Sequence, residues 1–169
     1  MCAPTSAEIV SLAQAADADA VRACVRAAYS HYVERIGREP APMTADYIGL
    51  IRSGVVYVLH PPAEEDILGV LVLRASAEAL WIENVAVQPQ HQHRGYGRRL
   101  LQFAEEQARA TGVGELRLYT NELMVENIRL YTRLGWVEFD RRLEEGFRRV
   151  FMRKSVAPTS GSRKSLDQG

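Results

Sequence analysis

The sequence contains little cysteine and no long apolar run. Its 169 residues include two cysteines, Cys2 and Cys24, which are too few for a disulfide framework. No CxxC or Cys/His ligand spacing is present, so we expect no bound metal. No apolar stretch approaches the roughly 20 residues that span a bilayer, and the N-terminus lacks the basic and apolar segments of a signal peptide. These absences predict a cytoplasmic protein that does not associate with membranes.

The sequence also lacks an excess of charge of either sign. Lysine plus arginine number 21, and aspartate plus glutamate number 21. This balance gives no reason to expect binding to nucleic acid or to an anionic membrane surface. Recognition of a charged ligand therefore has to come from a local cluster of residues.

The hydrophobic pattern predicts a single mixed α/β domain over residues 1–154 and a disordered polar tail over residues 155–169. Thr44 is expected to cap a short helix that ends near Gly54. The expected strands are 8–12, 55–59, 67–73, 80–87, 116–120, 136–141 and 147–153, and the expected helices are 17–36, 44–54, 97–110 and 124–134.

The clearest functional signal is a glycine-containing turn between the strand that ends at Val87 and the next helix. Its sequence is Gln92-His93-Arg94-Gly95-Tyr96-Gly97. Amides in the first turn of a helix lack intrahelical partners, and the helix dipole adds positive charge, so this end can bind a diphosphate. The glycines let the backbone approach closely, and Arg94, Arg98 and Arg99 add local charge. By itself, the turn fits an ordinary strand-to-helix connection equally well.

With the preceding Val87-Gln88-Pro89, this turn resembles the Q/R-x-x-G-x-G/A signature of the GNAT superfamily of N-acetyltransferases. The segment from Asn121 to Trp136 is similar to the helix of that family that ends in L-Y-x-x-L-G-F. Two competing phosphate motifs, GxxxxGKS/T and GxGxxG in a βαβ unit, are absent. The resemblance implies an α/β fold in which a mixed, mostly antiparallel central sheet splays in a V and about four helices flank it.

The resemblance also implies a reaction, the transfer of an acetyl group from acetyl-CoA to a primary amine of a small molecule, amino acid or peptide. Direct attack in a ternary complex is expected, because Cys24 lies outside the matched segments. In the family the pantetheine arm lies in the opening of the V, so the strand residues Val85, Ala86 and Val87 are expected to hold it, with the Val85 amide on the thioester carbonyl. The remaining expected acetyl-CoA ligands are Gln92, His93, Arg94, Gly95, Tyr96, Gly97 and Arg98.

One segment departs from the family pattern. Many members carry an asparagine seven residues before the helix tyrosine and an alanine four residues before it, whereas this sequence has Met124 and Asn127. Asn127 is a candidate ligand of acetyl-CoA, although the amide could come from a different turn. The departure leaves an alternative function open, that of a catalytically inactive CoA-binding sensor or regulatory protein.

Acetyl transfer needs an acid for the leaving thiolate. Tyr131 matches the tyrosine of the family's helix and is the candidate. The alternative is a half-buried tyrosine that only packs against Ile128 and Leu134, because the helical spacing is the same in both cases.

The reaction also needs a base for the amine, and Glu83 is the candidate. It alternates with Trp81 and Val85 on one face of the central strand, where apolar neighbours can raise the pKa of a carboxyl group. Glu83 would act directly or through water. The alternative is a structural glutamate that pairs with the backbone or an arginine.

The acceptor pocket is expected between the first two helices and their connection. Tyr29 and Tyr32 are the leading candidates there, followed by His31, Arg35 and Tyr47. Aromatic residues with mixed charge suit a small amine better than a histone-like tail. A homodimer is compatible with the sequence.

Overall fold

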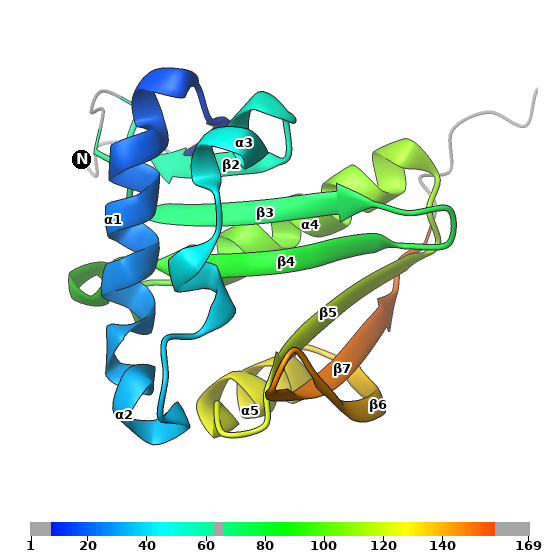
Figure 1. Ribbon diagram of the computed structural model, residues 1–169. Helices are drawn as coiled ribbons and strands as arrows, with labels where there is room; N and C mark the ends of the chain where they lie inside the picture. Colours follow the sequence, from blue (N-terminus) through cyan, green and yellow to red (C-terminus); the bar gives the residue numbers. More distant parts are fainter. Residues whose placement is uncertain (1–7, 63–65, 158–169) are drawn as a thin grey trace, which may run out of the picture.

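A mixed β-sheet forms the centre of the protein (Figure 1). The structure, a computed structural model, describes residues 8–62 and 66–157. Within these residues the sheet has seven strands in the order β1-β2-β3-β4-β5-β7-β6. β4 and β5 are parallel and the other neighbours are antiparallel, which confirms the predicted sheet. The strands are β1 (Ile9–Leu12), β2 (Val56–His60), β3 (Gly69–Ala75), β4 (Leu80–Val87), β5 (Glu115–Asn121), β6 (Val137–Glu144) and β7 (Phe147–Ser155).

The parallel pair of strands separates along its length (Figure 1). β4 and β5 are paired from Leu80 to Ile82 on one strand and from Leu116 to Leu118 on the other. Beyond these residues the strands diverge, so the edge of β4 that faces β5 is not paired with any strand of the described residues. This is the V-shaped opening that the family resemblance implies.

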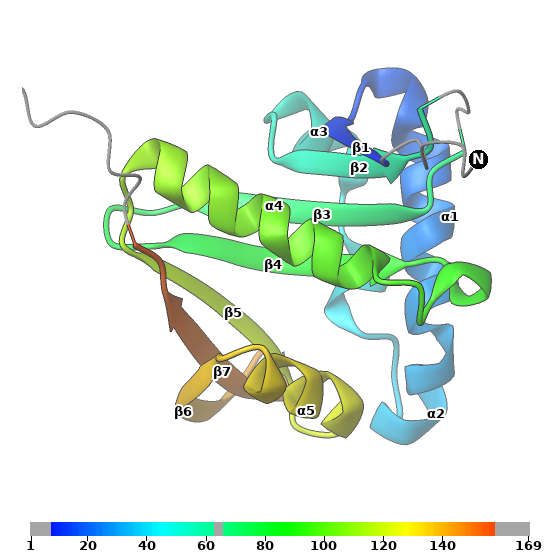
Figure 2. The same cartoon turned by 180° about the vertical axis from the view of Figure 1, so that it is seen from behind.

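Helices cover both faces of the sheet (Figures 1 and 2). α1 and α3 pack on one face, in a cluster with β2, β3 and β4. α4 and α5 pack on the other face, in a cluster with β3, β4, β5 and β7. The predicted first helix, expected to give way at Gly37, is interrupted by a 3-10 turn at Ser30–Tyr32, so that α2 is a separate short helix. The helices are α1 (Ala18–Tyr29), α2 (Val33–Ile36), α3 (Tyr47–Arg52), α4 (Tyr96–Thr111) and α5 (Val125–Arg133).

The amphipathic pattern of α4 accounts for its position behind the sheet. Leu100, Leu101, Ala104 and Ala108 recur at helical spacing, and all four are buried against the strands. Gly112 ends the helix in the left-handed conformation, with φ of 75°. The helix thus begins one residue before the predicted range and ends one residue after it.

A β-bulge at Glu83 changes which residues of β4 share a face. The pairing of β4 with β3 skips Glu83. Because a bulge inserts one residue into a strand, the side chains after it point to the face opposite to that expected from simple alternation. Ile82 and Val85, three residues apart, therefore pack in the same cluster beside α4. The sequence placed Glu83 and Val85 on one face, but in the structure they line different cavities.

Two predicted boundaries differ from the structure. The cap of α3 is Asp46, whose carboxylate accepts a hydrogen bond from the Gly49 amide at 3.1 Å, whereas Thr44 ends a preceding 3-10 turn. β7 continues through Ser155, and Val156 after it is buried. The ordered domain therefore extends past the predicted limit at residue 154. Residues 158–169 of the predicted tail lie outside the described residues.

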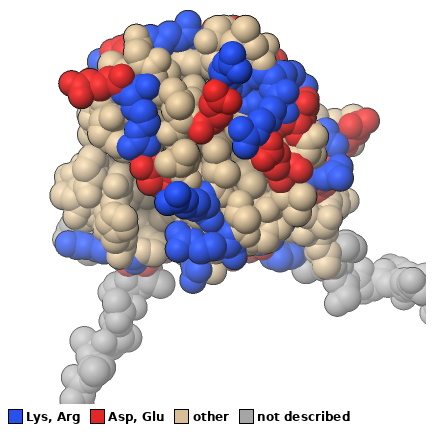
Figure 3. Space-filling view, turned by 90° about the horizontal axis from the view of Figure 1, so that it is seen from below, with Lys and Arg blue, Asp and Glu red and all other residues tan. Residues whose placement is uncertain are grey.

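Charges of both signs are mixed on the surface. The face shown in Figure 3 carries Lys and Arg side chains, some of them grouped together, with Asp and Glu side chains beside them. Ion pairs between such residues include Arg142 with Asp140 at 2.8 Å and Arg35 with Glu126 at 2.8 Å. No helix of the described residues is both long enough and apolar enough to cross a membrane.

Candidate functional site

A groove of about 680 Å³ runs along the open edge of β4. Its walls come from the C-terminal end of α1, the residues after it, β4, the turn before α4, and α5. Arg94 is exposed outside the groove, and Ala86 is buried on the other face of β4. The predicted residues that line the groove are Tyr29, Tyr32, Val85, Val87, Gln92, His93, Gly95, Tyr96, Gly97, Arg98, Asn127 and Tyr131.

The turn before α4 presents free backbone amides to this groove. The first helical hydrogen bond joins the Arg99 amide to the Gly95 carbonyl at 2.9 Å, so the amides of residues 96–98 precede it and have no intrahelical acceptor. Gly95 has φ of 87°, and a Cβ there would have nothing within 4 Å. The Gln92 side chain donates to the Val87 carbonyl at 3.1 Å and holds the turn against β4. The turn is therefore open, fixed and able to bind an anion.

His91 adds an unsatisfied polar atom to the same region. The residue is half-buried and lines the groove. Its Nδ1 atom is buried and has no hydrogen-bond partner among the described residues. Buried polar atoms are almost always hydrogen-bonded in native proteins. The unpaired Nδ1 atom therefore indicates that a bound ligand supplies its hydrogen-bond partner.

The exposed edge of β4 supplies further backbone groups. The Gln88 amide donates to Leu68 on the β3 side at 2.9 Å. Because amides alternate in direction along a strand, those of Val87 and Val85 point away from β3, toward the opening. The Val85 carbonyl accepts a hydrogen bond from the Tyr29 hydroxyl at 3.2 Å. Thus the peptide groups of Val85 lie at the groove, where an extended ligand can bind them.

The ring of Tyr131 is buried, and the residue also lines the groove. The ring packs against Trp136, with centroids 6.0 Å apart, and against the cluster that includes Ile128 and Leu134. Among the described residues the hydroxyl has no hydrogen-bond partner. Burial, with a smaller effect of Tyr32, raises the pKa of Tyr131 well above its ordinary value, so the hydroxyl keeps its proton at neutral pH.

Met124 and Asn127, the residues that depart from the family pattern, contact each other. Met124 is buried at the start of α5, and its sulfur accepts a hydrogen bond from the Asn127 amide at 3.7 Å. The same sulfur accepts from the Thr120 hydroxyl at 3.5 Å. Asn127 also lines the groove, one helical turn before Tyr131. The methionine thus fixes the position of the asparagine side chain.

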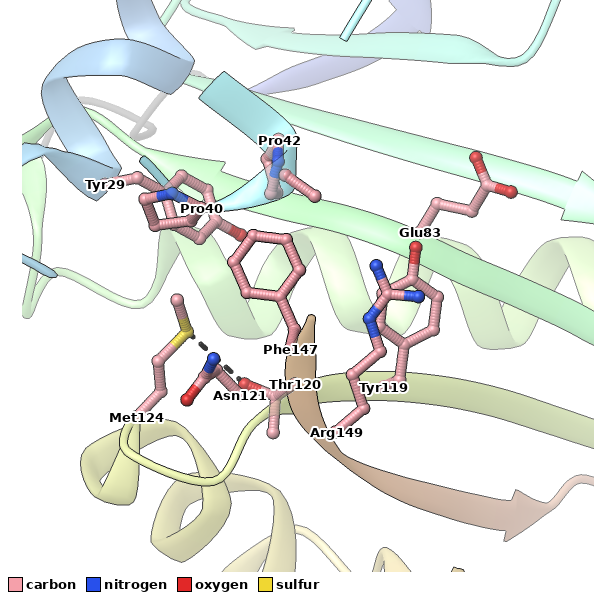
Figure 4. Close-up of a pocket in the computed structure, with 11 residues that line it drawn as sticks. Tyr29, Pro40, Pro42, Glu83, Tyr119, Thr120, Asn121, Met124, Phe147 and Arg149 are labelled. Carbon is pink, nitrogen blue, oxygen red and sulfur yellow. Dashed lines mark hydrogen bonds between the residues drawn. The ribbon is translucent and has the colours of Figure 1, made fainter. Parts of the chain in front are cut away.

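A second, much smaller cavity of about 50 Å³ lies near the divergence of β4 and β5 (Figure 4). Pro40 and Pro42 form one side of it, and Tyr119, Phe147 and Arg149 form another. The remaining lining residues are Tyr29, Ala41, Glu83, Thr120, Asn121 and Met124. Tyr29 is therefore in the walls of both cavities.

Glu83 belongs to the small cavity and is paired with an arginine. Its two carboxylate oxygens accept hydrogen bonds from Nε and Nη2 of Arg74 at 2.6 and 3.3 Å. The alternative considered for Glu83, pairing with an arginine, is thus present in the structure. Glu83 is a lining residue of the cavity, although its carboxylate points away from the other labelled side chains in Figure 4.

A buried hydrogen-bond network supports the small cavity, and sequence analysis missed its central residue, Asn84. The Tyr29 hydroxyl donates to the Asn84 side-chain oxygen at 2.8 Å, and the Asn84 amide donates to the Tyr47 hydroxyl at 3.1 Å. Tyr47 in turn donates to the Pro42 carbonyl at 2.6 Å. Tyr47 was expected in the acceptor pocket, but it lies behind the lining. A polar residue at a buried position of an apolar strand is the signal that would have identified Asn84.

The other expected acceptor residues lie elsewhere. Tyr32 and His31 line the large groove and not the small cavity. Arg35 forms an ion pair with Glu126 at 2.8 Å, and its guanidinium is 5.3 Å from the centre of the Tyr32 ring. The hydrogen bond from Arg35 lowers the pKa of the Glu126 carboxyl. This ion pair joins α2 to α5 beside the groove.

No group of three or more His, Cys, Asp or Glu residues in the described part of the chain is arranged to hold a metal ion. A search of curated protein sequences gives no significant match. Among solved structures, PaiA N-acetyltransferase from Thermoplasma acidophilum, in complex with coenzyme A, has a TM-score of 0.72 and 17% identity, and the match covers 88% of this chain and 99% of that chain. The ribosomal-protein-S18-alanine N-acetyltransferase from Escherichia coli has a TM-score of 0.69 and 18% identity, covering 93% and 98%.

A third structure, nourseothricin acetyltransferase, is 25% identical with a TM-score of 0.55. That match covers 60% of this chain and 65% of that chain, which is less than two thirds of its length. Comparison with family profiles matches residues 21–136 to the acetyltransferase (GNAT) family. The matched residues make up more than half of the chain and include α5 and the turn before α4. The protein therefore belongs to the GNAT family of acetyltransferases.

Proposed function

We propose that the protein transfers an acetyl group from acetyl-CoA to a primary amine by direct attack in a ternary complex. The observation that carries the proposal is the composition of the large groove. It brings together the open turn before α4, the free edge of β4 and the Tyr131 hydroxyl, which come from three separate segments of the chain.

The groove suits acetyl-CoA along its whole length. The amides of residues 96–98, with Arg98 beside them, would bind the diphosphate. The peptide groups of Val85 and Val87 would bind the pantetheine arm as an added strand does. A relative of the same fold has been solved in complex with coenzyme A. The unsatisfied Nδ1 of His91 is a further group that a bound ligand would satisfy.

Residues from both cavities would carry the chemistry, Val85 and Tyr131 from the groove and Glu83 from the small cavity. The amine attacks the acetyl carbonyl carbon while the Val85 amide stabilises the charge that develops on the oxygen. The proton of the amine passes to Glu83, through water. The carbon–sulfur bond then breaks, and the Tyr131 hydroxyl protonates or hydrogen-bonds the departing thiolate.

Direct attack is supported by the absence of a suitable nucleophile. Among the described residues that line the groove there is no cysteine, serine or threonine. Cys24 is on the buried face of α1, near the Leu68 carbonyl, and burial raises the pKa of its thiol to about 12. A thiol that stays protonated and inaccessible does not form an acyl-enzyme.

Two measurements test this proposal. Calorimetry is expected to show acetyl-CoA binding, and a thiol-release assay is expected to show turnover with at least one class of primary amine. Acetyl-CoA binding without turnover on any amine would favour the CoA-binding sensor instead. No binding would refute both functions.

The role of Glu83 has its own test. Glu83→Gln is expected to lower kcat/KM by about 100-fold or more and to remove the acid-side limb of its pH profile. Arg74→Ala is the matched control, because it breaks the ion pair and leaves the carboxylate in place. An equal loss of kcat/KM in both variants would show that the ion pair has a structural role and that Glu83 is not the base.

A further inference from the structure

The small cavity is much too small for most ligands. Its volume is about 50 Å³, compared with about 680 Å³ for the groove. Sites for drug-sized ligands range from about 300 to 1,000 Å³, and one water needs roughly 10 to 15 Å³. The small cavity therefore holds a group of only a few heavy atoms.

The wall formed by residues 40–42 is fixed on the side of α1. Arg26 donates to the Glu39 carboxylate at 2.9 Å and to the Met43 carbonyl at 3.3 Å, on either side of this segment. Tyr47 holds the Pro42 carbonyl between them at 2.6 Å. Three hydrogen bonds thus resist movement of this wall away from the sheet.

Arg38 joins the same segment to the hairpin between β6 and β7. Its guanidinium carbon is 3.4 Å from the centre of the Phe147 ring, and its Nη2 donates to the Glu145 carbonyl at 2.6 Å. Phe147 is itself in the wall of the small cavity. Arg38 therefore ties two opposite walls together, and a larger acceptor would have to break this contact.

The two charged side chains that line the cavity, Glu83 and Arg149, are both paired. Glu83 is paired with Arg74 at 2.6 Å. Arg149 is buried, and its guanidinium is paired with Glu144 at 3.0 Å and with Glu145 at 3.3 Å. Arg38 lies behind Phe147, where it donates to the Glu145 backbone carbonyl. Because both charges of the lining are already paired, a second charged group of the acceptor would have to displace one of these partners or be desolvated at a cost.

Most of the uncharged part of the wall is aromatic or apolar, and Thr120 and Asn121 are its polar residues. Tyr29, Tyr119, Phe147, Met124 and the two prolines enclose most of the cavity (Figure 4). The Arg149 guanidinium, which lies 4.4 Å from the centre of the Tyr119 ring, covers the face of that ring. A surface of this kind favours a short apolar substituent.

From this size, rigidity and charge balance, we infer that the acceptor is a small primary amine that carries no second charge, and that the contact of Arg38 with Phe147 sets the upper limit of its size. The inference rests on the proposed acetyl transfer and narrows its acceptor. It excludes free amino acids, polyamines and peptides as preferred acceptors.

Three amines of similar length test the inference that the acceptor carries no second charge. Propylamine, 3-aminopropanoate and 1,3-diaminopropane differ at the far end by a methyl, a carboxylate and an ammonium group. Measured at one pH, kcat/KM for propylamine is expected to exceed kcat/KM for each of the other two amines by about tenfold or more. A preference for either charged amine would overturn the inference while leaving acetyl transfer intact. Acetyl-CoA binding without turnover on any amine would overturn both.

Arg38→Ala tests the size limit. The ratio of kcat/KM for 1-naphthylmethylamine to that for propylamine is expected to rise by about tenfold, since the wall at Phe147 is released. Arg22→Ala is the matched control, because Arg22 pairs with exposed Asp19 on α1 and is expected to leave the ratio unchanged. The melting temperature and the acetyl-CoA affinity of both variants establish that they are folded. An unchanged ratio in folded Arg38→Ala would overturn the role of Arg38.

Discussion

The Tyr131 side chain illustrates how one residue can contribute to packing and to the proposed chemistry. Its ring is in the core beside Trp136, while its hydroxyl is at the groove without a partner among the described residues. The helical spacing with Ile128 and Leu134 predicts the packing. It says nothing about the hydroxyl, so the proposed role came from the resemblance to the family.

Tyr131→Phe separates the two contributions. The ring remains, so the free energy of unfolding is expected to change by no more than about 1 kcal/mol, the usual net value of one hydrogen bond. A proton donor used mainly in the transition state accelerates the reaction by a factor of about 10² to 10⁴. The variant's kcat is therefore expected to fall by that factor, while its acetyl-CoA affinity stays within a few-fold of that of the original protein. Steady-state kinetics, calorimetry and denaturant unfolding measure these quantities.

Tyr57→Phe is the control for removing a tyrosine hydroxyl elsewhere. Tyr57 is on β2, where its ring packs 4.9 Å from that of Phe103, outside both cavities. It is expected to leave kcat unchanged. If Tyr131→Phe also keeps its kcat but unfolds more easily, Tyr131 is a core residue without a catalytic role.

Asn84 is a residue whose importance depends on contacts distant in sequence. Its partners come from α1 and α3, so nothing near it in the sequence indicates the network. Asn84→Leu removes both hydrogen bonds at similar volume and is expected to destabilise the protein by about 1 to 3 kcal/mol. Because Tyr29 and Pro42 also line the small cavity, the KM of the amine is expected to rise more than the Kd of acetyl-CoA. Equal changes in both constants would contradict a role specific to the acceptor side.

At the scale of the secondary-structure elements, the sequence predicts α4 and its turn well and β4 less well. The helical period of Leu100 and Ala104 and the glycines that flank α4 are local signals, and each predicts the observed structure. The bulge at Glu83 arises from pairing with β3, which no local pattern encodes. Most residues predicted to bind acetyl-CoA therefore lie together in the large groove, Ala86 and Arg94 excepted, whereas the small cavity was not predicted.

The two ends of α4 provide a matched test of the anion site. Gly95 and Gly112 both have positive φ, 87° and 75°, and a Cβ added at either position would meet no neighbouring atom within 4 Å. Valine at either position imposes similar backbone strain. Gly95→Val, however, also places a branched side chain at the proposed diphosphate site, so calorimetry is expected to detect no acetyl-CoA binding.

Gly112→Val is expected to lose comparable stability and to keep its acetyl-CoA affinity within a few-fold. Thermal unfolding of both variants checks that the strain is matched. If the two variants bind acetyl-CoA equally well, the diphosphate does not bind at the turn before α4.

At the scale of the whole molecule, the two cavities meet at one side chain. Tyr29 is in the walls of both, and its hydroxyl is bonded to Val85 on the groove side and to Asn84 on the side of the acceptor network. Burial raises the pKa of Tyr29 well above its ordinary value, so this hydroxyl remains a hydrogen-bond donor. If acetyl-CoA occupies the groove and the amine the small cavity, as proposed, the two substrates would meet beside Tyr29.

The extent of the folded domain gives the last prediction. Val156 is 5% exposed, packs in the cluster beside α4, and donates its amide to the Gly114 carbonyl at 3.0 Å. A chain that ends at Ser155 loses this burial and is expected to be less stable by about 1.5 to 3 kcal/mol. A chain that ends at Ala157 keeps it and is expected to match the full chain, because residues 158–169 are almost entirely polar. Urea unfolding of the three chains compares them directly, and a loss of stability on ending at Ala157 would show that residues 158–169 contribute to the fold.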